Sequence, residues 1–310
     1  MRFLDEQRRR PAALADHLPW AALVAPGVVL NKDGSFTTGF RFRGPDLDSS
    51  TEDELMAVRA RLNNALRRLG TGWCLHMEAR RRAASPYPES AFDLDVAWLL
   101  DEERRARFET GEPAFETDYR LTLTWLAPAD ETRRIERWLF DGLARAGADW
   151  RQALSRFTRE TATVFDLLSD ALPEIAPLDD TELLTWLHDC VSPRRIAVTP
   201  PNPPMFLDAL LADAALTGGV APRLGDHWLQ VVSVRSLPAT TRPGLLDALG
   251  ALPFAYRWTA RWIGLDKSEA EREIVRLRKR WFAKRKGVGV LLREAITKEE
   301  APLLDTDAAS

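Results

Sequence analysis

Cysteine is scarce in this sequence, with Cys74 and Cys190 the only two among 310 residues. A chain of this length can bury about three quarters of its unfolded surface, so its core needs no disulfide to hold it together. Two cysteines so far apart fit a protein of a reducing compartment. The length alone suggests roughly two domains.

Long apolar runs and a strong charge of one sign are also absent. The longest apolar stretch, residues 18–30, is too short to cross a bilayer and is interrupted by Pro19 and Pro26. The N-terminal sequence MRFLDEQRRR lacks the apolar region of a signal peptide. A net charge of −3 provides no global attraction to nucleic acid or to an anionic membrane. These observations predict a soluble or peripheral protein.

The sequence patterns of phosphate and metal sites are missing as well. A phosphate loop follows G-x-x-x-x-G-K-[ST], and the nearest stretch, RWIGLDKS, has Arg261 and Asp266 at the two glycine positions. Cys74 and His76 lie two residues apart, whereas structural zinc sites favour C-x₂₋₄-C and H-x₃₋₅-H spacings. No carboxylate pair and no oxyanion hole identify an acid–base or nucleophilic site. We therefore predict no catalytic, cofactor-binding or metal-binding residue in this chain.

Apolar periodicity predicts a chain that mixes strands and helices. Strands are expected at residues 28–30, 36–42, 73–79, 119–125, 228–238 and 254–263. Helices are expected at residues 51–69, 92–110, 135–144, 150–172, 179–191, 243–250 and 267–286, with a further one inside 199–216. Asp33-Gly34 predicts a tight turn between the first two strands. Thr51 and Glu54 form a capping-box pattern at the first of the helices.

Two segments, residues 36–79 and 228–263, share the order strand, loop, helix and strand. Such a unit is typical of a crossover connection or a split βαβ motif. We predict an α+β fold of two split βαβ-like lobes with a helical segment between them. The first lobe is expected at residues 1–130, the helical segment at 131–216, the second lobe with a C-terminal basic helix at 217–290, and a polar tail at 291–310.

The last predicted strand is aromatic on one face. Tyr256, Trp258 and Trp262 alternate with Arg257 and Arg261. The usual interpretation is an aromatic core face with the arginines in water. An aromatic strand beside arginines can also stack single-stranded bases, so a nucleic-acid-binding module stays open as an alternative.

The helix that follows, residues 267–286, is strongly basic. Its apolar stripe of Ile274, Leu277 and Trp281 is expected to pack on the second lobe. A solvated face is the default for such charges, and contact with a protein partner, a lipid or a nucleic acid is the next interpretation. The candidates for partner contact are Arg278, Lys279, Lys284, Arg285 and Lys286.

Several stretches taken together resemble a known family. They are "LPWAALVAPGVVLNKDGSFTTGFRFRGPDLDS", "PRLGDHWLQVVSVRSLPATTRPGLLDAL" and "LPFAYRWTARWIGLDKSEAE". In order and spacing they resemble the N-terminal portion of TrbE-type conjugal-transfer ATPases, of the CagE/TrbE/VirB family of type IV secretion systems. The resemblance extends over most of the chain.

The resemblance implies a subunit whose RecA-like motor domain, with Walker A and B motifs, follows this region. The 310 residues hold no such motif, so ATP and Mg²⁺ are expected on the motor domain and no catalytic residue is transferred to this chain. What the resemblance implies here is a non-catalytic docking and assembly domain. Its expected partners are other secretion subunits at the inner membrane and neighbouring copies, and its expected location is cytoplasmic and peripheral. A nucleic-acid module and an enzyme with an unrecognised site remain the alternatives.

Overall fold

A computed structural model describes residues 13–111, 113–128, 149–234, 238 and 240–285, without the side chains of residues 281–285. Its contacts divide the chain into two units. One comprises residues 1–68 and 72–263, and the other comprises residues 69–71 and 264–310. Each unit is described by itself.

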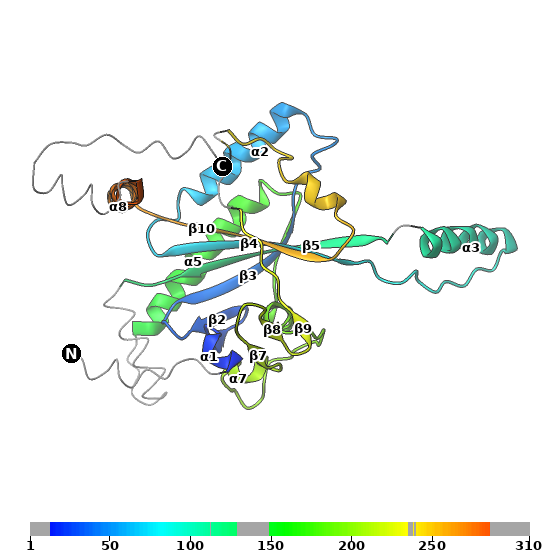
Figure 1. Cartoon of the computed structure of the whole chain (residues 1–310), viewed down its shortest axis with the longest axis horizontal. Helices are drawn as coiled ribbons and strands as arrows, with labels where there is room; N and C mark the ends of the chain where they lie inside the picture. The colour runs from blue at the N-terminus through cyan, green and yellow to red at the C-terminus, as the bar shows by residue number, and fades with distance from the viewer. Residues whose placement is uncertain (1–12, 112, 129–148, 235–237, 239, 286–310) are drawn as a thin grey trace, which may run out of the picture. The chain divides into compact units, whose positions relative to one another are not determined.

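The first unit contains two antiparallel sheets and most of the helices (Figure 1). Its strands are β1 (Trp20–Ala25), β2 (Val28–Asn31), β3 (Phe36–Arg43), β4 (Trp73–Ala83), β5 (Phe115–Trp125), β6 (Glu174–Pro177), β7 (Leu216–Thr217), β8 (Arg223–Leu224), β9 (His227–Trp228) and β10 (Tyr256–Ile263). Its helices are α1 (Leu14–His17), α2 (Glu52–Leu66), α3 (Asp95–Thr110), α5 (Asp149–Ser169), α6 (Asp180–Val191), α7 (Leu207–Leu211) and the 3₁₀ helix η1 (Asp247–Ala251).

The larger sheet has the strand order β1-β2-β3-β5-β4-β10, and β6 pairs with β3. Every pair in it is antiparallel. The turn from β2 to β3 holds Gly34 at a φ of 81°, as the Asp33-Gly34 dipeptide predicts. Asp33 Oδ1 accepts the backbone N–H of Ser35 at 3.0 Å. Local turn chemistry therefore sets the register in which the first strands enter the sheet.

A long ribbon extends from the centre of this sheet. β4 and β5 are paired from Trp73↔Trp125 to Ala83↔Phe115. β3 accompanies β5 only as far as Arg41↔Arg120, so the far part of the β4–β5 pair continues past β3. Helix α3 connects these two strands and lies beyond the end of the ribbon (Figure 1).

Helix α5 packs on one face of the sheet. Phe157 is fully buried, with its ring centroid 5.7 Å from that of Phe36 and 5.8 Å from that of Trp73. Further along α5, Phe165 stacks on Phe40 with the ring centroids 5.7 Å apart. Aromatic side chains from β3 and β4 therefore form the centre of this core, and burial of their large apolar area stabilises the α5–sheet contact.

Helix α6 packs on the opposite face, where Gly39 of β3 permits a close approach. A Cβ atom at Gly39 would lie 3.0 Å from Leu178 Cδ1 and 3.1 Å from Leu183 Cδ1. The buried cluster around this contact consists of Leu14, Leu18, Val29, Leu178, Leu183, Leu184, Leu187, Leu207, Leu211 and Leu224. The sheet therefore has a helix-covered core on each of its faces.

The structure confirms the α+β class and most of the predicted elements. The capping box is formed, with Thr51 Oγ1 accepting the N–H of Glu54 at 3.3 Å and Glu54 Oε2 accepting the N–H of Thr51 at 2.8 Å. Helix α3 ends at Gly111 as expected. The helix predicted at residues 135–144 lies outside the described residues, and the domain boundaries at 130, 216 and 290 stay a prediction.

Three features differ from the predicted arrangement. β10, expected in a second lobe, is the outer strand of the main sheet and pairs with β4. Of the strand predicted at residues 228–238, only Trp228 belongs to a strand, β9, and residues 229–234 have no regular structure. The segment expected to be helical also contributes β6 to the sheet. Periodicity identifies a strand but not its pairing partner, because pairing depends on residues far away in the sequence.

The second unit contains helix α8 (Lys267–Arg285). Thr71 Oγ1 accepts the backbone N–H of Asp266 at 3.0 Å and donates to the carboxylate of Glu269. The carbonyl of Asp266 then accepts the N–H of Ala270 at 2.8 Å, which starts the helix. A short piece of chain, residues 69–71, therefore anchors the beginning of α8.

Candidate docking site

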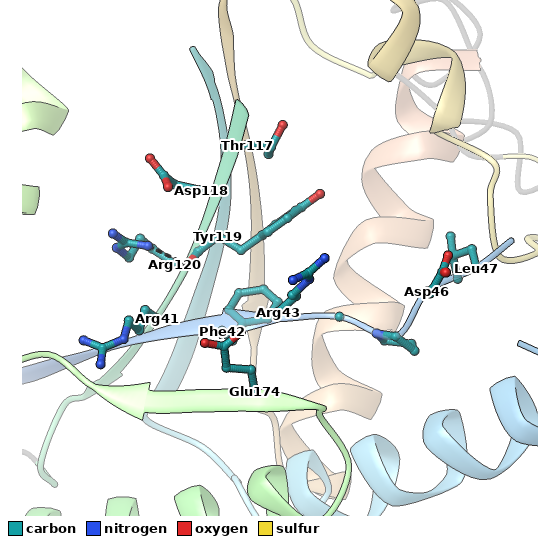
Figure 2. Close-up of a pocket in the computed structure, with 12 residues that line it drawn as sticks. Arg41, Phe42, Arg43, Asp46, Leu47, Thr117, Asp118, Tyr119, Arg120 and Glu174 are labelled. Atoms are coloured by element: carbon teal, nitrogen blue, oxygen red, sulfur yellow. Dashed lines mark hydrogen bonds between the residues drawn. The ribbon is translucent and has the colours of Figure 1, made fainter. Parts of the chain in front are cut away.

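An open groove lies where β3 and β5 separate (Figure 2). Its volume is about 760 Å³, and it is bordered by the end of β3 with the loop after it, by β5 and by Glu174 of β6. Phe42 and Tyr119 form its aromatic wall, with ring centroids 5.7 Å apart. Tyr119 remains 38% exposed. The groove is a surface hollow of the kind that accepts a side chain from a partner.

Charge in this groove is balanced. The ionic side chains lining it are Arg41, Arg43, Asp46, Asp118, Arg120 and Glu174. Arg41 Nη1 lies 2.6 Å from Glu182 Oε1 on α6. Arg82 Nε lies 2.8 Å from Asp118 Oδ2. Because carboxylates match the guanidinium groups, the groove has no excess positive charge of the kind that binds phosphate.

A buried carboxylate ties three elements together behind the groove. Glu78 of β4 is 6% exposed and accepts the indole N–H of Trp186 on α6 at 3.2 Å. Arg257 of β10 places its Nε 3.4 Å from the same carboxylate and donates through Nη2 to the carbonyl of Asp189 at 2.9 Å. Arg80 forms an ion pair with the Asp189 side chain. The cluster fixes both α6 and β10 on β4.

Neither cysteine has the surroundings of a nucleophile. Burial, followed by the negative charge of Glu78, raises the pKa of the Cys190 thiol to about 12. Burial also raises the pKa of Cys74, against a smaller opposing effect of Arg261. The thiolate is the reactive form of cysteine, so both side chains are expected to be inert near neutral pH.

Alkylation of the native chain should reflect these pKa shifts. At pH 7.5 we expect iodoacetamide to modify Cys190 at least about 100-fold more slowly than in the urea-unfolded chain, because almost none of its thiol is ionised. Cys74 should react faster than Cys190 but slower than a free thiol. Mass spectrometry of timed digests measures both rates. Faster native labelling of Cys190 than of Cys74 would contradict this assignment.

The aromatic strand is neither core nor open platform. Trp258 and Trp262 of β10 are half-buried, because β10 is the outer strand and pairs on one side only. Their expected burial in a core is therefore only partly realised. Of the two arginines on the other face, Arg257 is engaged by Glu78, and Arg261 is exposed opposite His76 of β4.

The five partner-contact candidates lie on α8 or just after it. Arg278 and Lys279 are exposed on the helix. Lys284 and Arg285 belong to its last turn, where side chains are not described, and Lys286 lies outside the described residues. Ile274 and Leu277, expected to pack, are instead 53% and 57% exposed. The role of the five cations in contacting a partner stays a prediction.

Sequence reasoning missed the surface of helix α3. None of its sixteen residues is buried. Its exposed apolar side chains are Val96 (70%), Trp98 (53%), Leu99 (63%) and Leu100 (53%), and Leu94 before it is 71% exposed. A signal was available, because these apolar residues are distributed around the helix rather than along one stripe. Exposed apolar patches of this kind mark interaction surfaces.

The stretch that came nearest to a phosphate loop has a different structural use. Gly264 connects β10 to α8, and a Cβ atom there would collide with the carbonyl oxygens of Leu69 and Gly70. Packing against the chain therefore explains this glycine. Among the described residues, no three His, Cys, Asp or Glu side chains are grouped to hold a metal ion. None of the described helices combines the length and apolar character needed to cross a bilayer.

Comparison with known proteins identifies the region. Residues 27–133 match the N-terminal domain of the type IV secretion system ATPase VirB4/TrbE. The matched range includes β3, α2, β4, α3 and β5, so the ribbon and its helix lie inside this domain. The conjugal transfer protein TrbE of Rhizobium radiobacter is 34% identical over 300 residues, covering 91% of this chain and 36% of that protein. The chain thus spans about a third of that relative's length.

Two further relatives agree with this match. A probable conjugal transfer protein TrbE of Sinorhizobium fredii is 41% identical over 125 residues, which are 39% of this chain and 84% of that protein. The type IV secretion system protein virB4 of Bartonella quintana is 21% identical over 281 residues, which are 84% of this chain and 35% of that protein. The chain therefore belongs to the VirB4/TrbE family of type IV secretion system ATPases and carries a TrbE-type N-terminal region.

Proposed function

We propose that these 310 residues are a non-catalytic docking and assembly region of a TrbE-type ATPase. In this proposal ATP and Mg²⁺ are bound and hydrolysed by a region of the protein outside the 310 residues. Helix α3 carries the argument, because it presents four large apolar side chains at the end of a ribbon and buries none of them. Such a surface is typical of a site that a partner covers.

The sequence supports the division between docking and ATP turnover. It lacks the glycines and lysine of a phosphate loop. The ionic side chains in the groove of Figure 2 are matched by opposite charges, which suits a protein contact better than a polyphosphate. The partners we propose are other type IV secretion subunits and neighbouring copies, at the cytoplasmic face of the inner membrane.

Helix α8 is the proposed second contact. Its exposed cations are suited to an acidic protein surface or an anionic membrane face. The five partner-contact candidates are Arg278, Lys279, Lys284, Arg285 and Lys286. Contact with a nucleic acid through these residues and β10 is the alternative, and Arg257 would have to leave Glu78 to take part in it.

The test compares the chain with a variant that carries glutamate at all five candidates. Calorimetry with Mg-ATP should detect no micromolar binding to the unmodified chain. Affinity for the inner-membrane secretion subunits of the same conjugation system should fall at least about tenfold in the variant, because attraction becomes repulsion. A control variant carries glutamate at Arg59, Arg67 and Arg68, which are exposed on or just after α2.

Parallel titrations distinguish the alternatives. Liposomes containing phosphatidylglycerol and a single-stranded oligonucleotide serve as probes for the membrane and nucleic-acid hypotheses. If the five changes abolish tight DNA binding and leave the subunit and liposome contacts untouched, the nucleic-acid hypothesis replaces this proposal. Micromolar Mg-ATP binding to the chain would also overturn it.

A further inference from the structure

The chain carries one helix that is apolar and acidic. Residues 83–103, which lead into α3 and form its first half, contain no Lys, Arg or His. Their acidic residues are Glu89, Asp93, Asp95, Asp101, Glu102 and Glu103. Val96, Leu99, Leu100 and Glu103 are spaced i, i+3, i+4 and i+7, so they share one face of the helix. All four are exposed.

Contacts of α3 with the rest of the described chain leave this face open. Tyr87, in the segment before α3, packs its ring 5.8 Å from that of Phe108 and donates its hydroxyl to Asp101 at 2.7 Å. Arg105 lies over the Tyr87 ring at 5.4 Å and near Asp101. These contacts support the other side of α3. A single helix of this length gains most of its stability from packing, so a partner on the open face would stabilise it.

The partner of this face must be apolar and basic. Two copies of α3 could place their apolar residues together only by also bringing their acidic residues together, since acids stand on both sides of the apolar stretch. Like charges at such a contact are destabilising. An anionic membrane is disfavoured for the same reason. The face therefore requires apolar side chains accompanied by Lys or Arg.

Helix α8 has this chemistry. Ile274, Val275 and Leu277 are 53%, 49% and 57% exposed. Arg276 is paired with Glu273 at 2.7 Å. The next three cations, Arg278, Lys279 and Arg280, are exposed and make no ion pair within the part of the chain that the structure describes. Ile274, Leu277 and Arg278 share one face through their i, i+3, i+4 spacing.

We propose that α3 of one copy docks on α8 of a second copy. Val96, Leu99 and Leu100 meet Ile274 and Leu277, and Glu103 meets the cations that begin at Arg278. The inference deepens the proposed assembly role and rests on it, since it names the acidic surface that α8 contacts. The contact joins two different surfaces, so it is heterologous and propagates from copy to copy into a ring or a chain. Its small size predicts weak, concentration-dependent association.

The test uses two variants that each disable one side of the contact. Variant A carries Leu99→Gln, Leu100→Gln and Glu103→Gln, and variant B carries Ile274→Gln, Leu277→Gln and Arg278→Gln. Glutamine keeps helix propensity while it removes the apolar groups and the charges. A control variant carries Met56→Gln and Arg59→Gln on exposed positions of α2. Circular dichroism confirms that each variant is folded.

Sedimentation measures the result. The unmodified chain and the α2 control should increase in mass with concentration, and each variant alone should stay monomeric. An equal mixture of A and B should stop at a 1:1 dimer, because A retains a competent α8, B retains a competent α3, and the remaining surfaces are disabled. Sodium chloride should weaken the association in every associating sample.

Several results would overturn the inference. They are a monomeric unmodified chain at every concentration, undiminished association of either variant alone, and a mixture that stays monomeric although the unmodified chain associates. A second measurement asks whether Leu100→Cys in one chain forms a disulfide with Leu277→Cys in another, and cross-linking within one chain also counts against the proposal. Binding of the secretion subunits and of Mg-ATP is measured separately, so failure of self-association is distinguishable from failure of the proposed docking role.

Discussion

Replacing Phe157 by alanine is expected to lower the free energy of unfolding by about 3–5 kcal/mol. Phe157 is fully buried on α5 and touches the rings of Phe36 and Trp73. The loss combines the transfer energy of a phenyl ring with the cavity that the surrounding strands cannot close. Because these rings come from β3 and β4, the change weakens the contact between α5 and the centre of the sheet.

Urea denaturation of the two chains measures this loss. The matched control is Trp98→Ala, which removes an even larger ring from the exposed surface of α3. It should change the unfolding free energy by less than about 0.5 kcal/mol, since no core contact is lost. Equal losses for the two variants would show that the α3 side chain, and not only the α5 side chain, belongs to a folded core.

The second large effect is expected at Glu78. Glu78→Ala should cost about 3–5 kcal/mol, because removing one partner of a buried pair leaves the other unpaired. Arg257 would lose its carboxylate and the indole N–H of Trp186 its acceptor. Since these residues belong to β10 and α6, we also expect faster hydrogen exchange in both elements.

Three further variants give this prediction its controls. Glu78→Gln keeps an oxygen acceptor for Trp186 and should recover part of the loss. Glu116→Ala breaks a more exposed pair with Arg82 on the same ribbon and should cost less than about 1 kcal/mol. Replacing Glu78 and Arg257 together by leucine should restore much of the stability, because no uncompensated charge remains. A harmless Glu78→Ala change would remove the cluster from the interactions that hold β10 in place.

The local elements were predictable because their causes are local. The Asp33-Gly34 turn, the Thr51 capping box and the Gly111 stop each act within a few residues, and the structure confirms all three. Alternation along residues 119–125 likewise predicted a strand with one buried face, and Leu121 and Leu123 are buried in β5. These features require no knowledge of the neighbouring elements.

The candidate site was less predictable, because exposure depends on what covers a side chain. Ile274 and Leu277 have the spacing of a packed stripe, yet both are exposed. Trp258 has the alternation of a core strand, yet its strand lies at the edge of the sheet and the residue is only half-buried. Periodicity shows which residues share a face, and it does not show whether another element packs on that face.

Two conclusions about this protein needed only the sequence. Its residue order contains no phosphate loop, and its motifs place it beside TrbE-type ATPases, because both are properties of neighbouring residues read in order. The tertiary structure decided that β10 pairs with β4, that Glu78 is buried beneath Trp186, and that α3 stands uncovered beyond the β4–β5 ribbon. Each of these depends on residues that are distant along the chain and adjacent in space. Strand pairing, desolvation of a charge and coverage of an apolar surface arise only when those residues meet.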